Sequence, residues 1–410
     1  MNEKLLRKFA NLAVKVGVNI QEGQLLVVNA PVECYDFVRL IVEEAYKAKS
    51  GNVVVKWNDS VTNKFYYLNV SDDVLKEVPE HVVKQGEYFV DKKGAFLSIA
   101  SPNPGLMADV DPKKMMISQK AANEKMSFLR KYTMSNGGQW TVIAAPNYDW
   151  AKKVFPDAKF SEVVDQLWDA ILTASRVTED NDPVQEWTEH MERLDAHNKK
   201  LNKYNFKKLH FKNNLGTDLE VQLVENHIWG GGGELSQTGV YFAPNIPTEE
   251  TFSMPHKDGV NGKVVSTKPL NYSGKLIEGF WLEFKDGKVV KYHADKEEAA
   301  LKSLLELDEG SSRLGEVALI SHDSPISNTN ILFYNTLFDE NASCHLALGN
   351  AYTMNIKDGY TLSEEELKAK GYNKSMTHVD FMFGSEDMKI VGTTQDGKEV
   401  KVFEKGNFVF

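Results

Sequence analysis

The sequence of 410 residues contains only two cysteines, Cys34 and Cys344, and they lie far apart. Two distant cysteines cannot form the disulfide framework of a small secreted protein, so a reducing cytoplasm is favoured. No apolar run is long enough to cross a bilayer. The opening stretch MNEKLLRKFANLAVKVGVNI places charges between its apolar residues. It therefore predicts an amphipathic surface helix rather than a signal peptide, and we expect a cytoplasmic protein that does not bind membranes.

An excess of positive charge is also lacking, because 58 Asp and Glu residues outnumber 48 Lys and Arg residues and the net charge is −10 at pH 7. A general nucleic-acid binder needs a basic face, so we expect no nucleic-acid partner. The first predicted strand is not followed by a GxGxxG turn, which gives no support for a dinucleotide site. The glycine run Gly230 to Gly233 lacks the Lys-Ser/Thr of a phosphate-binding loop. It is interpreted as a flexible loop near the functional site.

The length exceeds what one hydrophobic core usually serves, so two domains are expected. Up to about residue 205, apolar runs alternate with helical patterns, as in βαβ units that build a parallel sheet. The predicted strands are residues 24–30, 51–57, 94–100 and 140–147, and the predicted helices are residues 34–49, 71–87, 111–134, 160–174 and 183–204. We expect residues 1–205 to form an open α/β domain with a parallel sheet.

From residue 206 the strand signals come closer together, with β-branched and aromatic residues in alternation. Asp286-Gly287 and Asp396-Gly397 are hairpin-turn signals between such stretches. The segment DKEEAALKSLLELDEG is the one clear helix, and it ends on Gly310. We expect residues 206–410 to form a mostly antiparallel, β-rich α+β domain that carries the catalytic site.

Acidic residues and histidines recur in this second half in apolar or glycine-flanked settings. They are Glu250 in PTEETF, Glu316 in RLGEVALIS, Glu340 and His345 in LFDENASCHLALG, and His378 and Asp380 in HVDFMFG. His378 and Asp380 stand two apart in a predicted strand, so their side chains point to the same face. Carboxylates and imidazoles from four separated segments are what a two-metal hydrolytic site needs. We interpret the six residues as one constellation.

Each of these residues also has an ordinary structural explanation. Glu316 can be a strand-edge glutamate in solvent, and one of the adjacent Glu249 and Glu250 is expected to face solvent. Glu340 can be an acid at a helix start, and His345 can be a buried, hydrogen-bonded histidine. Between Glu340 and His345 a turn leading into a short helix is expected. Taken singly, Glu316 and His345 favour the ordinary explanation.

Four segments, PTEETF, RLGEVALISHDSPIS, FYNTLFDENASCHLALGNAY and HVDFMFG, match one known family in order and spacing. In them the chain resembles the aminopeptidase T and aminopeptidase S family, which includes the enzymes called PepS and AmpS. The resemblance spans the whole chain, from LLRKFANLAVKVGVNIQEGQ to the C-terminal strand. It implies a dinuclear metallo-aminopeptidase with an N-terminal α/β domain and a β-rich catalytic domain. It also implies a homodimer whose sites open into an enclosed space.

Carried over by position, the resemblance assigns roles to seven residues. The implied metal ligands are Glu250, Glu316, Glu340, His345, His378 and Asp380. Glu316 would bridge two divalent ions and so take part in catalysis, and Tyr352 would be a catalytic side chain beside them. A tyrosine hydroxyl near a metal can polarise a carbonyl or stabilise an oxyanion. Cys344, next to His345, is expected to be packed rather than a ligand.

The expected reaction is the removal of N-terminal residues from short peptides with a free N-terminus. Two divalent ions roughly 3.5–4 Å apart lower the pKa of a bridging water and polarise the peptide carbonyl. The substrate's α-amine would bind one of the ions, which makes the enzyme an exopeptidase. Mixed carboxylate and imidazole ligands suit zinc, cobalt or manganese. The alternatives are another two-metal hydrolase, either an amidase or a phosphoesterase, and a non-catalytic peptide-binding protein.

Overall fold

The computed structural model describes residues 2–410. Its internal contacts divide the chain into two compact units. The first unit runs to His190 and includes Gly233–Pro247, and the second comprises Met191–Gly232 and Thr248–Phe410. The sequence predicted one boundary, after residue 205. The structure differs from that prediction in the place of the boundary and in the segment that returns to the first unit.

The returning segment belongs to the first unit because it runs along the edge strand β4 (Trp140–Ala144). The Val142 N–H donates to the Pro244 carbonyl at 2.8 Å, and the Ile246 N–H donates to the Val142 carbonyl at 3.0 Å. Both bonds satisfy backbone groups that an edge strand leaves unpaired. Sequence patterns carry no signal for such pairing, because the two segments are about 100 residues apart.

The first unit is built on a parallel sheet in the order β2-β1-β3-β4. Its other strands are β1 (Leu25–Pro31), β2 (Asn52–Asn58) and β3 (Ala95–Ala100). All four lie where the apolar runs predicted them. The helices of this unit are α1 (Glu3–Leu12), α2 (Tyr35–Lys47), α3 (Ser60–Asn69), α4 (Asp72–Leu75), α5 (Glu80–Asp91), α6 (Pro112–Lys125), α7 (Ser127–Met134), α8 (Tyr148–Val154) and α9 (Val163–Ala174).

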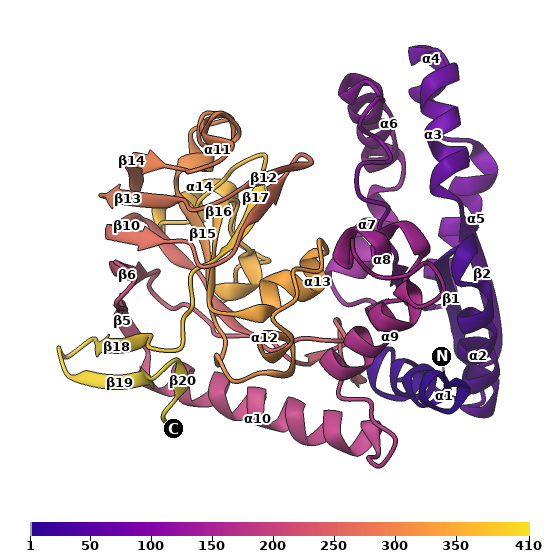
Figure 1. Ribbon diagram of the computed structural model, residues 1–410, viewed down its shortest axis with the longest axis horizontal. Coiled ribbons are helices and arrows are strands. Elements are labelled where there is room, and N and C mark those ends of the chain that lie inside the picture. Colours follow the sequence, from indigo (N-terminus) through magenta and orange to yellow (C-terminus); the bar gives the residue numbers. More distant parts are fainter. Residues whose placement is uncertain (1) are drawn as a thin grey trace. The chain divides into compact units, whose positions relative to one another are not determined.

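Helices cover both faces of this parallel sheet (Figure 1). On one face, α2 packs on β1 and β2, and the rings of Phe9, Phe37 and Trp168 meet at centroid distances of 5.1–6.4 Å. On the other face, Phe89 of α5 packs against Phe96 of β3. Because both faces are covered, successive side chains of a strand are buried on either side, and the strand sequences are continuous apolar runs. The predicted open α/β domain is confirmed.

Two predicted helices are interrupted in the structure. The segment expected to be one helix over residues 71–87 contains α4 and α5, because Pro79 caps the start of α5 and separates the two. The segment over residues 111–134 contains α6 and α7, which meet at Met126. The predicted start of α6 is confirmed, since Asp111 caps it by accepting a hydrogen bond from the Lys113 N–H.

The long helix α10 (Pro183–Tyr204) spans the boundary at His190 and leads into the second unit. That unit contains an antiparallel sheet in the order β14-β13-β10-β6-β5-β18-β19-β20. Its strands are β5 (Phe206–Lys212), β6 (Asp218–Leu223), β10 (Pro255–Val265), β13 (Trp281–Lys285), β14 (Lys288–His293), β18 (Lys389–Thr394), β19 (Glu399–Glu404) and β20 (Asn407–Phe408). Turns at Asp286-Gly287 and Asp396-Gly397 join β13 to β14 and β18 to β19, as predicted.

A second, four-stranded antiparallel sheet in this unit has the order β17-β16-β15-β9. Its strands are β9 (Thr251–Ser253), β15 (Leu314–Leu319), β16 (His345–Gly349) and β17 (His378–Met382). The two sheets share one apolar core, in which Phe211 contacts Phe383 and Phe280 contacts Phe381 at ring centroid distances of 5.2 and 5.6 Å. The predicted antiparallel, β-rich second half is therefore confirmed. Among residues 2–410, no helix has the length and apolar character needed to cross a membrane.

Candidate metal centre

The four-stranded sheet separates an apolar face from a charged face. Val317, Leu346 and Phe381 point into the shared core and are fully buried. Alternation along a strand places their neighbours on the opposite face. There, Glu316 pairs with Ala347 and Ala347 pairs with Asp380, so both carboxylates lie in one row across three strands.

A β-bulge sets the direction of Glu316. Leu314 pairs with Leu348 but Glu316 pairs with Ala347, so Gly315 is the extra residue in β15. The bulge lets Leu314 join the core while Glu316 points to the charged face. Gly315 is needed there, because a Cβ atom would lie 2.4 Å from the Gly349 carbonyl oxygen.

Two triads of candidate ligands meet on the charged face, and Glu316 belongs to both. One is Glu250, Glu316 and His345, and the other is Glu316, His378 and Asp380. In each triad the ligating atoms lie within 4.8 Å of one another. Glu316 uses one oxygen for each histidine, with Oε1 3.2 Å from His345 Nε2 and Oε2 3.7 Å from His378 Nε2.

The remaining contacts complete each triad. His345 Nε2 lies 3.4 Å from Glu250 Oε2, and His378 Nε2 lies 3.2 Å from Asp380 Oδ1. The other ring nitrogen of His378, Nδ1, lies 2.7 Å from the Asn350 carbonyl oxygen. Because a carbonyl oxygen can only accept a hydrogen bond, Nδ1 carries the hydrogen. In the neutral imidazole, Nε2 then has the lone pair that can bind a metal. This role of Asn350 could not be predicted from the sequence, because a backbone carbonyl has no sequence signature.

Glu340 lies beside the triads but belongs to neither. Its carboxylate interacts electrostatically with those of Asp380, Glu250 and Glu316. It begins a 3-10 turn (Glu340–Ala342) that directly follows helix α13 (Thr336–Asp339), whereas His345 begins strand β16. The expected order was wrong: the short helix precedes Glu340, and a strand rather than a helix follows.

Asn341 ties the Glu340 segment to the Glu250 segment. It is fully buried, and its side-chain oxygen accepts a hydrogen bond from the Glu249 N–H at 2.8 Å. The glycine run also reaches this segment. Gly231 has φ +126°, and a Cβ atom there would lie 2.3 Å from the Glu250 carbonyl oxygen. The loop is therefore near the site as predicted, and it needs glycine for close backbone approach.

Glu316, Glu249 and Glu250 are more buried than expected when each residue is considered on its own. Glu316 is 4% exposed, because β15 lies between β16 and β9 and is not at an edge. Glu249 is 7% exposed and the Glu250 side chain 12% exposed, so neither member of this pair faces solvent freely. The expectations of a strand-edge Glu316 and of one solvent-facing acid at 249–250 were both wrong. Cys344 is buried and packed, as expected, and its Sγ accepts from the Ile320 N–H.

Tyr352 lies next to the second triad. Its ring centroid is 4.6 Å from that of His378, and Phe252 packs edge-on at 6.3 Å. Burial raises the pKa of its hydroxyl well above the usual value, and the negative charges of Glu316 and the other carboxylates raise the pKa further. The hydroxyl therefore keeps its proton at neutral pH and can donate a hydrogen bond.

This cluster contains four carboxylates and only two imidazoles. The excess of acidic groups contributes to the shifted pKa values of several of its members. Burial raises the pKa of Glu250 to about 8, and it also raises the pKa of Glu340 well above its usual value. Burial lowers the pKa of both histidines, but contacts with carboxylates outweigh it and bring each pKa to about 9. For Asp380, burial raises the pKa, yet the contact with His378 leaves it below the usual value.

The donor set fits divalent metal ions. Within residues 2–410, no lysine or arginine forms an ion pair with any of the six residues. Two imidazoles cannot balance four buried carboxylates, and a divalent cation removes the cost of the remaining negative charge. Oxygen and imidazole nitrogen donors suit zinc, cobalt and manganese. The shared Glu316 gives the cluster two adjoining sets of donors.

A recess opens on this cluster within the second unit. It has a volume of about 250 Å³, and Glu340, His378 and Asp380 contribute to its wall. The rest of its wall mixes apolar side chains, among them Leu270, Leu332 and Met382, with polar ones, among them Asn271, Asn335 and Asp339. The recess therefore places ligand atoms beside a wall of mixed polarity.

Known proteins share both the sequence and the fold. The family described as thermophilic metalloprotease (M29) matches residues 2–408. Aminopeptidase 2 of Geobacillus stearothermophilus is 48% identical over 408 residues, which cover 100% of this chain and 98% of the relative. Aminopeptidase AmpS of Bacillus subtilis (strain 168) is 48% identical over 405 residues, covering 99% and 98%. The structure of wild-type AmpT from Thermus thermophilus superimposes with a TM-score of 0.91 at 35% identity and covers 100% of both chains.

The fold, the cluster of candidate metal ligands and the sequence relatives all indicate the same class of protein, the metal-dependent peptide hydrolases. The chain belongs to the M29 metalloprotease family. The resemblance on which the sequence analysis relied is thereby confirmed over the whole chain.

Proposed function

We propose that this chain is a metal-dependent aminopeptidase that holds two divalent ions, with Glu316 shared between them. The single observation that carries the proposal is the pair of triads, because two donor sets adjoin and have one carboxylate in common. One set is Glu250, Glu316 and His345, and the other is Glu316, His378 and Asp380. Glu340 stands beside both and would complete the donor set as the sixth ligand.

Divalent ions bound there would supply a water of lowered pKa as the nucleophile and polarise the scissile carbonyl. The chain's own residues hold and orient that chemistry. Asn350 fixes the tautomer of His378, and Asn341 fixes the backbone that carries Glu250. Tyr352 can donate its proton in a hydrogen bond to an oxygen on which negative charge develops.

The recess beside Glu340, His378 and Asp380 is the proposed place of the substrate's first residue. Its apolar residues Leu270, Leu332 and Met382 would contact that side chain, and Glu340 and Asp380 would face the reacting end. A free α-amine offers a lone pair or a positive charge, and both suit a cluster of carboxylates and cations. Acetylation removes both properties. This is why the proposed activity requires a free N-terminus.

Acetylated peptides are therefore expected to resist cleavage. The test compares a free dipeptide, its N-acetylated form and a folded protein with an unblocked N-terminus, all with the metal-loaded enzyme. Release of the first residue from the free dipeptide alone is the expected result. Cleavage of the acetylated peptide at a comparable rate would refute the exopeptidase reaction. Processing of the folded protein would refute the preference for short peptides and leave the metal chemistry standing.

Three further properties are part of the proposal. Zinc, cobalt or manganese is the expected metal, because the donor set mixes carboxylate and imidazole. A homodimer is expected from the family resemblance, and light scattering of the purified protein tests it. A cytoplasmic location is supported by Cys34 and Cys344, which are both free and buried.

A further inference from the structure

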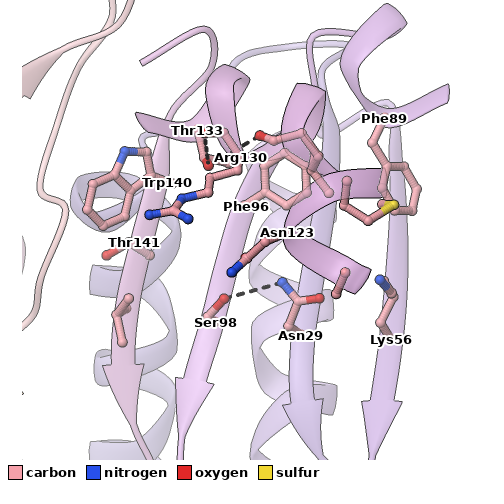
Figure 2. Close-up of a pocket in the computed structure, with 14 residues that line it drawn as sticks. Asn29, Lys56, Phe89, Phe96, Ser98, Asn123, Arg130, Thr133, Trp140 and Thr141 are labelled. Carbon is pink, nitrogen blue, oxygen red and sulfur yellow. Dashed lines mark hydrogen bonds between the residues drawn. The ribbon is translucent and has the colours of Figure 1, made fainter. Parts of the chain in front are cut away.

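The parallel sheet of the first unit carries a row of polar side chains that the peptidase chemistry does not use. Asn29 of β1 is in register with Lys56 of β2 on one side and with Ser98 of β3 on the other. In-register residues of parallel neighbours point to the same face. The Asn29 side-chain amide donates a hydrogen bond to the Ser98 hydroxyl at 3.2 Å (Figure 2).

Aromatic rings lie two residues earlier on β3 and beside it, on β4 and helix α5. Phe96 of β3 pairs with Trp140 of β4, and Phe89 of α5 packs edge-on against Phe96 at a centroid distance of 6.1 Å. These three rings and the polar row line one cavity of about 420 Å³. That volume is in the range of small-molecule binding sites. All residues that line it belong to the first unit, which contains none of the candidate metal ligands.

Helices α6 and α7 provide the opposite wall. Asn123 comes from α6 and Arg130 from α7, and Figure 2 shows both side chains on the helix side of the polar row. Apolar side chains of the same helices complete this wall, among them Met126 and Leu129. Figure 2 shows Arg130 beside Trp140, whereas Lys56 lies on the opposite side of the cavity, beyond Asn29.

The charge of the cavity is unusual for this chain. Lys56 and Arg130 line it, whereas no aspartate or glutamate does. Among residues 2–410, neither cation has an acidic partner within ion-pair distance. The whole chain carries a net charge of −10, so two cations without an acid in one cavity run against its overall balance. A cavity lined in this way attracts anions.

We propose that this cavity binds a small organic anion with an apolar or aromatic body. One of the two cations, Arg130 on one side of the cavity or Lys56 on the other, would bind the anionic group through charge-assisted hydrogen bonds. Asn123 and Ser98 would add neutral hydrogen bonds. Phe96 and Trp140 would contact the apolar body. Carboxylates and phosphate esters share this chemistry, and the experiment below distinguishes them.

Topology supports the same position. The sheet has a topological switch point between β1 and β3. The chain places β2 on one side of β1 and then places β3 and β4 on the other side. In open α/β sheets, ligands bind near the carboxyl ends of the strands at such a switch point. Asn29 and Ser98 lie on the two strands that flank this point, each two residues before the carboxyl end. The cavity extends from them over the sheet face to Phe96 and Trp140 near the amino ends of β3 and β4.

The test is isothermal titration of the intact, metal-loaded enzyme with 3-phenylpropionate, its neutral amide and phenyl phosphate. At least one of the two anions is expected to bind saturably, and the amide at least about ten-fold more weakly. The tighter of the two anions identifies the anionic group. A carboxylate or phosphate can also bind to the metal ions of the loaded enzyme. Only binding that is weakened by substitutions of the cavity residues therefore supports the proposed site.

Variants separate the cavity from other sites. At least one of Arg130→Gln and Lys56→Gln is expected to weaken anion binding by about ten-fold or more, and that variant identifies the cation that contacts the anionic group. Lys131→Gln is the matched control, because it removes the same charge from the next residue of α7, which does not line the cavity. This control is expected to bind like the wild type. Ala122→Phe would fill the cavity and is expected to abolish binding with both cations retained.

Melting curves of all four variants check that each remains folded. Two results would overturn the proposal. One is the absence of saturable binding of either anion by the wild type. The other is binding that Arg130→Gln, Lys56→Gln and Ala122→Phe leave unchanged in folded protein.

Discussion

Replacing Glu316 by glutamine is expected to abolish turnover while the fold stays intact. Glu316 is the one residue common to both triads, and each of its oxygens faces a different histidine. Glutamine keeps the volume of the side chain, so the packing of β15 is preserved. The amide carries no charge and offers only one acceptor oxygen, so it cannot serve two cations. Loss of this one carboxylate therefore affects both donor sets at once.

The measurement is kcat for a free dipeptide, with circular dichroism and a melting curve to establish the fold. Glu220→Gln is a suitable control, since Glu220 lies on β6 of the same unit, where it pairs with Lys208. The control is expected to retain full activity. Activity close to that of the wild type in folded Glu316→Gln would show that Glu316 is only a structural residue of its strand.

Replacing Tyr352 by phenylalanine is expected to lower kcat far more than it raises KM. The ring of Tyr352 lies against His378, and its hydroxyl has a raised pKa, so it is a proton donor at neutral pH. A hydroxyl that meets charge only in the transition state leaves ground-state binding alone. Loss of one oxyanion donor typically costs about 100–1000-fold in kcat. We expect a loss of that size.

Phenylalanine retains the ring contacts with His378 and Phe252, so the substitution removes only the hydroxyl. Tyr132→Phe is a matched control, because it removes a hydroxyl that donates to the Gly94 carbonyl in the first unit. Steady-state kinetics of both variants give kcat and KM separately. A change confined to KM in Tyr352→Phe would place this residue in substrate binding instead of catalysis.

Secondary structure was predictable wherever a local pattern determined it. The apolar run at residues 24–30 predicted β1, whose residues are almost all buried. The helix predicted over residues 183–204 is α10, and Asp182 caps it by accepting a hydrogen bond from the Val184 N–H. Helix α3 was not predicted, although Val61, Phe65 and Leu68 stand at helical spacing. These side chains are exposed in the structure, so the helix buries none of them.

The site was predictable in its members but not in its geometry. The two-residue spacing of His378 and Asp380 predicted their shared face, and the structure places them 3.2 Å apart. The environment of Glu316 could not be predicted, because it depends on antiparallel pairing of strands distant in sequence and on the bulge at Gly315. Register between distant strands is not encoded in local periodicity. That Glu316 belongs to both triads is therefore a result of the structure.

Metal content at saturation tests the central claim most directly. The purified protein is loaded with zinc, cobalt or manganese, freed of unbound metal, and measured for metal per chain and for turnover on the same sample. Two ions per chain are predicted, since five of the six candidate ligands fall into two triads and Glu316 belongs to both. Fewer than two are predicted for Glu316→Gln. A single tightly bound ion per chain at saturating metal, together with full activity, would contradict the account.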